Sequence, residues 1–96
     1  MDALTKLVAT VPGATRWVDG EREADIRKLL EDEEFVYPLS SGERARVYLW
    51  AQLFNGYTPS VLRDEGWDFG RAAAALDQDG QVALIRVLQR IWGVSR

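Results

Sequence analysis

The residues best equipped for chemistry in this chain are carboxylates, and four of them are consecutive: Glu31, Asp32, Glu33 and Glu34. Such a group could bind a metal ion, imitate nucleic-acid phosphates, or supply the acid and base of a catalytic pair. A catalytic pair, however, needs a pocket that separates two pKa values. Four consecutive acids at a helix end point in several directions, mostly into water. The pattern therefore favours a solvated helix end, then an acidic docking patch, over catalysis, and these four residues are candidate partner-binding residues.

A second acidic stretch, Asp77 to Gly80, resembles the start of a calcium-binding loop. An EF-hand loop needs oxygen ligands at positions 1, 3 and 5, glycine at 6 and glutamate at 12. With Gly80 at position 6, Ala75 occupies position 1 and Arg86 position 12, and the register that begins at Asp77 fails in the same way. An aspartate that caps a helix, Asp77 or Asp79, explains these residues better.

The composition removes most other catalytic chemistry. The chain has no cysteine and no histidine, so it has neither a thiolate nor an imidazole to serve as nucleophile, general base or metal ligand. The serines at 40 and 41 lie in neither a nucleophile elbow nor a phosphate-binding loop. The sequence therefore predicts a protein that is not an enzyme and carries no cofactor or metal.

Four tryptophans are a high count for 96 residues. Trp50 and Trp92 lie within apolar helical patterns, which predicts that both are core residues. Trp17 and Trp67 lie between turn signals, where an aromatic side chain can anchor a partner protein or close the end of a small bundle. Both alternatives stay open, and Trp17 and Trp67 join the candidate partner-binding residues.

The clearest element that could position these residues is a helix over 43–55. Ser40 followed by Glu43 fits a capping box, with Ser41 as the alternative cap. Gly56 favours the left-handed conformation that ends a helix. Apolar residues cover a sector wider than the stripe of a surface helix, which predicts that this helix is covered on more than one side.

The rest of the chain predicts an all-α fold, a small bundle of five to six helices that forms a single domain over 1–96. The other expected helices cover 1–11, 21–34, 59–65, 69–76 and about 80–92. Helix 59–65 is expected to start with Thr58 as cap and Pro59 at its first position, and helix 69–76 with Asp68 as cap. Because 43–55 and 81–92 are both apolar around most of their circumference, we expect these two to be the mostly buried inner helices. Residues 14–18 are expected to form a packed loop, although an extended segment is the alternative. The acidic end of helix 21–34 would oppose its dipole.

Charge and hydropathy limit the partners. The net charge is −3 and the pI is near 4.9, which argues against direct nucleic-acid binding. Residues 43–55 and 59–65 imitate a helix-turn-helix, but the second helix carries one arginine and two acids instead of a basic surface. No apolar run approaches the ~18 residues that span a membrane, and the N-terminus lacks the features of a signal peptide. We expect a soluble, cytoplasmic protein.

Part of the chain, roughly residues 39–93, resembles short uncharacterised all-helical proteins of actinobacteria and their phages. The residues that carry the resemblance are Leu39-Ser40-Ser41-Gly42-Glu43-Arg44, Leu49-Trp50, Asn55-Gly56, Leu76-Asp77, Leu84 and Val87-Leu88. The resemblance implies an actinobacterial or phage origin and a small helical fold, and it brings no catalytic or binding residues.

These observations favour a non-enzymatic protein-interaction or accessory module that acts through surface tryptophans and an acidic patch. A homodimer is one variant, since the two apolar helices carry more apolar surface than one small bundle covers. The alternative is a nucleic-acid-related regulator, either a divergent helix-turn-helix protein or an acidic nucleic-acid mimic.

Overall fold

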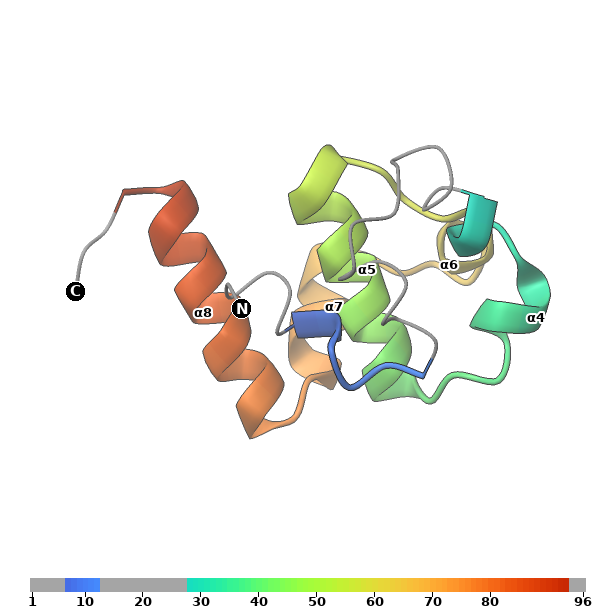
Figure 1. Ribbon diagram of the computed structural model, residues 1–96, viewed down its shortest axis with the longest axis horizontal. Coiled ribbons are helices and arrows are strands. Elements are labelled where there is room, and N and C mark those ends of the chain that lie inside the picture. Colours follow the sequence, from blue (N-terminus) through green and yellow to red (C-terminus); the bar gives the residue numbers. More distant parts are fainter. Residues whose placement is uncertain (1–6, 13–27, 94–96) are drawn as a thin grey trace.

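The computed structural model describes residues 7–12 and 28–93, and all regular secondary structure in these ranges is helical (Figure 1). The helices are α4 (Glu33–Val36), α5 (Ser41–Asn55), α6 (Ser60–Asp64), α7 (Phe69–Ala75) and α8 (Gln78–Ile91). The predicted small all-α bundle is confirmed. The predictions for Trp17, for 14–18 and for most of the helices over 1–11 and 21–34 lie outside the described residues.

Helix α5 is the centre of the fold, and its predicted ends are confirmed. The Ser40 hydroxyl accepts a hydrogen bond from the Glu43 N–H at 3.2 Å, and the Glu43 carboxylate accepts one from the Ser40 N–H at 2.8 Å. Gly56 ends the helix at φ 68°, in the left-handed region that glycine adopts without a Cβ clash. Every residue from Ala45 to Ala51 is buried, so α5 is an inner helix as predicted.

Helix α5 packs most closely against α7. Small residues line this contact: Gly42 lies beside the Ala75 carbonyl oxygen, which a Cβ there would meet at an ordinary contact distance of 3.6 Å, and Ala72 is fully buried. The Asp68 carboxylate caps α7 by accepting from the Arg71 N–H at 2.7 Å. This cap is the one that the sequence predicts.

The acidic segment is built differently from the prediction. Residues 28–30 are helical, but the chain turns at Glu31 and begins a new helix, α4, after Asp32. The Asp32 backbone is extended, and its carboxylate accepts a hydrogen bond from the Glu34 N–H at 3.0 Å. The single helix that was predicted to run to Glu34 is therefore wrong at this end. Its local cause is capping by Asp32, which places Glu33 and Glu34 in a first turn, where the helix dipole favours negative charge.

The capping of α6 also differs in detail from expectation. Pro59, expected at the first helical position, occupies the cap position instead, and it provides no side-chain cap. Thr58, the expected cap, accepts a hydrogen bond from the Gln52 side chain. The first N–H of α6, from Ser60, instead donates to the Glu31 carboxylate at 3.0 Å.

Helix α8 does not occupy the inner position that its sequence predicts. Its buried residues are Gly80, Leu84 and Val87, which form one stripe. Figure 1 shows α8 at one end of the molecule, with α4 at the opposite end. The helix carries Asp79, Arg86 and Arg90 on one flank, so it is not apolar around its whole circumference, and at the edge of the bundle it buries only the sector that meets a neighbour. None of the helices in the described ranges is long and apolar enough to cross a membrane.

Candidate functional site

The four carboxylates of the acidic cluster are all exposed, but two of them have structural partners. Glu31 accepts hydrogen bonds from the Tyr57 hydroxyl and the Ser60 N–H, and Asp32 caps α4. Only Glu33 and Glu34 have no partner among the hydrogen bonds and ion pairs described here. Within residues 7–12 and 28–93, acidic side chains form no group of three or more that could hold a metal ion. The cluster thus connects α4 to α6 and leaves two carboxylates facing water.

Trp67 is not a surface anchor. Its side chain is 7% exposed, its indole N–H donates to the Glu65 carboxylate at 3.2 Å, and the Arg71 guanidinium covers its ring at 4.1 Å from the centroid. The interpretation of Trp67 as an exposed partner-binding residue is therefore wrong, and the alternative, a ring that closes part of the bundle, is correct. Trp17 lies outside the described residues.

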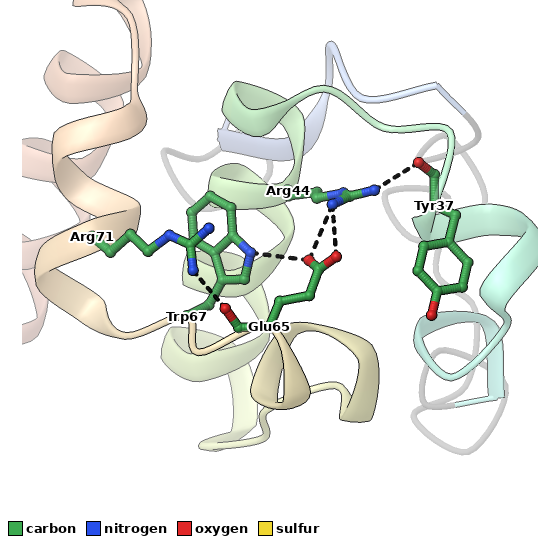
Figure 2. A network of polar contacts seen from close by, with 5 residues as sticks. All are labelled: Tyr37, Arg44, Glu65, Trp67 and Arg71. Atoms are coloured by element: carbon green, nitrogen blue, oxygen red, sulfur yellow. Dashed lines mark hydrogen bonds and ion pairs between the residues drawn. The ribbon is translucent and has the colours of Figure 1, made fainter.

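Trp67 belongs to a polar network that joins four parts of the fold, shown in Figure 2. One guanidinium nitrogen of Arg44 lies 2.8 and 3.1 Å from the two Glu65 carboxylate oxygens, and the other donates to the Tyr37 carbonyl at 2.7 Å. Arg71 donates to the Glu65 carbonyl at 2.7 Å. The network therefore fixes α5 to the ends of α4 and α6 and to the start of α7. Apart from the buried Arg44 Nε–H, which has no hydrogen-bond partner, its donors and acceptors pair with one another, so its role is structural.

Arg46 makes a second, deeper connection. It is the one charged side chain among the buried residues of the described ranges, at 7% exposure. Its guanidinium donates to the Leu7 carbonyl at 2.8 Å and to the Asp77 carboxylate at 2.9 Å. Asp77 also caps α8 by accepting from the Gly80 N–H at 2.7 Å. The Gly80 N–H is the main reason that the pKa of the Asp77 carboxyl lies below its usual 3.8; desolvation opposes it, and the Arg46 guanidinium lowers the pKa further.

Arg46 therefore positions α8, and Gly80 makes room for it. A Cβ on Gly80 would lie 3.1 Å from the Arg46 guanidinium, from the Asp77 carboxylate and from the Leu76 side chain. Such contacts are tighter than most real Cβ contacts, so glycine lets the first turn of α8 approach α5 closely. Asp77, rather than Asp79, is the cap.

Helices α5 and α6 follow one another as in a helix-turn-helix, but α6 does not present a basic surface. Helix α6 has five residues, of which Val61 and Leu62 are buried. Its one basic side chain, Arg63, lies 3.8 Å from the Asp64 carboxylate. The second helix thus carries neither the length nor the charge that contact with phosphates needs.

The outward side of α8 is the largest exposed apolar feature on any one helix of the described ranges. We call it the outer face and define it by three side chains: Val82 (41% exposed), Ile85 (54%) and Trp92 (70%). Val82, Ile85 and Trp92 repeat at spacings of three and seven, which places them on one side of the helix, opposite the buried stripe. Ile91 is 55% exposed but lies seven residues after Leu84, on the side of the buried stripe, and is not part of the outer face.

The two tryptophans expected in the core, Trp50 and Trp92, therefore differ in burial. Trp50 is 4% exposed, which confirms its prediction as a core residue, whereas the same prediction for Trp92 is wrong. Trp92 follows the last residue of α8 and extends past the bundle, so it has no neighbour to cover it.

Sequence reasoning also missed both arginines of α5. For Arg46 a signal exists: it lies three residues before Leu49 and four before Trp50, on the apolar side, where an arginine must find a partner. For Arg44 no such signal exists, because its partner Glu65 is 21 residues away.

No protein-family model matches this chain, and neither a search of curated proteins nor a search of solved structures found a match.

Proposed function

We propose that this protein is a non-enzymatic interaction module and that its binding surface is the outer face of α8. The observation that carries the proposal is the exposure of Trp92 and Ile85 beside Val82 on one side of one helix. Single exposed apolar residues are common, but a contiguous patch of several, with a tryptophan among them, is typical of a protein-binding site.

The position of α8 supports this proposal. The cap at Asp77 and the contact with Arg46 hold the first turn of the helix firmly, while the outer face projects from the end of the molecule. A helix that is already formed loses less conformational entropy than an unfolded segment when its exposed side binds a partner.

The acidic residues Glu33 and Glu34 are not part of the same surface. They lie on α4, at the other end of a molecule whose longest extent is 39 Å (Figure 1). A partner that covers the outer face would therefore leave the acidic residues free.

The proposal can be tested by affinity capture with the full chain as bait, using both a lysate of the source cells and a second, differently tagged copy of the chain. Ile85→Glu places a charge in the outer face, and Phe69→Glu places the same charge at a 42% exposed apolar position on α7 as a matched control. The expected result is that the wild type and Phe69→Glu retain the same bound protein, whereas Ile85→Glu loses it. Equal capture by all three baits would refute the proposal.

A further inference from the structure

We infer that the outer face binds a second copy of this chain, through antiparallel pairing of two α8 helices about a two-fold axis at Ile85. This inference rests on the proposed function, since it names the partner of the same surface. In such a pair Ile85 meets its own counterpart, and Val82 of one copy lies at the level of Leu88 in the other. Leu88 is half-buried and borders the outer face.

The area of the outer face suits a two-fold contact. At their exposed fractions, its three side chains present on the order of 400 Å² of apolar surface. A two-fold interface uses this surface twice, and with the flanking residues it reaches about 1,000 Å², the lower limit for a specific interface. The expected dimer is therefore weak, with a Kd in the micromolar range.

The charges of α8 are also self-complementary in this arrangement. Asp79 lies in the first turn, and Arg86 and Arg90 follow on the same flank at spacings of seven and four. In an antiparallel pair centred on Ile85, Asp79 of one copy lies within one residue of the level of Arg90 in the other. A parallel pair would place like charges and like helix ends side by side, which is unfavourable.

The residues that flank the outer face favour another copy over an anionic surface. Gln78 and Gln81 are exposed and uncharged, so two copies meet without like-charge repulsion along this edge. The net charge of −3, in contrast, opposes binding to phosphates of nucleic acid or anionic lipid.

Sedimentation equilibrium of the full-length protein tests the association. The wild type is expected to dimerise in the micromolar range, and Ile85→Glu and Trp92→Glu are each expected to raise the Kd at least about tenfold. Phe69→Glu should leave the Kd unchanged. Circular dichroism establishes whether each variant is folded. If one of the two variants on the outer face unfolds, the other still tests the association.

Disulfide trapping tests the geometry, because the chain has no cysteine of its own. A disulfide needs Cα atoms within about 7 Å. In the antiparallel pair two copies of Ile85→Cys meet at the axis, whereas two copies of Gln78→Cys lie roughly 21 Å apart along the helices. Rapid cross-linking of Ile85→Cys alone supports the inference. Equal cross-linking of Gln78→Cys indicates a parallel pair and overturns it.

The remaining outcomes are also decisive. A wild type that stays monomeric to about 1 mM overturns the inference, since even a weak interface would be occupied there. Dimerisation that survives both Ile85→Glu and Trp92→Glu overturns it as well, because the contact then lies elsewhere. The wild type could instead be monomeric and capture a different protein in a way that depends on Ile85. In that case the partner is not a second copy, but the proposed function still holds.

Discussion

Replacement of Arg46 by methionine tests the connection that holds α8 in place. The substitution keeps a long apolar side chain in the core but removes the donors to Leu7 and Asp77. The Leu7 residue is fully buried, so its carbonyl would lose a donor in a dry environment, at a cost of about 1–3 kcal/mol.

The lost ion pair adds less to this cost. The Asp77 side chain is 70% exposed, and water replaces the guanidinium there, so the pair itself contributes little. Removing a buried charge also recovers some desolvation energy. The expected net loss is about 2 kcal/mol, which would lower the Tm of a domain of this size by roughly 8–16 °C.

Urea unfolding at neutral pH, followed by circular dichroism, gives the measurement, and Arg63→Met is the control. Arg63 is exposed, with 66% of its side chain in contact with water, so its replacement should change stability by no more than about 0.5 kcal/mol. The loss of stability in Arg46→Lys should fall between those of Arg46→Met and Arg63→Met, because an ammonium lacks the planar guanidinium that reaches both acceptors. If Arg46→Met unfolds at the same urea concentration as the wild type, the hydrogen bonds of Arg46 to Leu7 and Asp77 do not stabilise the fold.

Three further predictions concern the core, the cap of α5 and pH. Trp50→Ala should cost about 3–5 kcal/mol because the side chain is 4% exposed, and unchanged urea unfolding would contradict its role in the core. Ser40→Ala should cost about 1 kcal/mol by removal of the capping box, whereas Ser41→Ala should cost far less; the reverse order of the two melting temperatures would move the start of the helix. Because the folded-state pKa of Asp77 is lowered, its carboxylate stabilises the fold above its ordinary pKa of 3.8, and this contribution is lost as pH falls through the folded-state value. Asp77→Asn should therefore reduce the acid-induced loss of stability below about pH 4, and a pH profile identical to that of the wild type would argue against this contribution.

The sequence by itself determined the features that depend on near neighbours in the chain. The capping box at Ser40, the glycine end at Gly56 and the caps at Asp68 and Asp77 each join groups three to five residues apart. Local geometry is enough to fix such contacts, so their positions could be predicted without knowledge of the fold.

The same local reasoning was wrong at Asp32, although the signal was present. An aspartate followed by two glutamates is a helix start, but within a run of four acids it was taken as part of a continuing helix. Two chemically reasonable patterns competed there, and the cap was the stronger one.

Only the tertiary structure decided which apolar sectors are covered. Helices α5 and α8 have similar apolar content, yet α5 is buried from Ala45 to Ala51 and α8 leaves Ile85 and Trp92 in water. Periodicity records which sides of a helix are apolar, and burial depends on how many neighbours the fold places around it. The partner of Arg44 was hidden for the same reason, since Glu65 is remote in the sequence. The candidate site is thus a product of assembly: the sequence supplies an apolar helix, and its place at the edge of the bundle makes one side of it a surface.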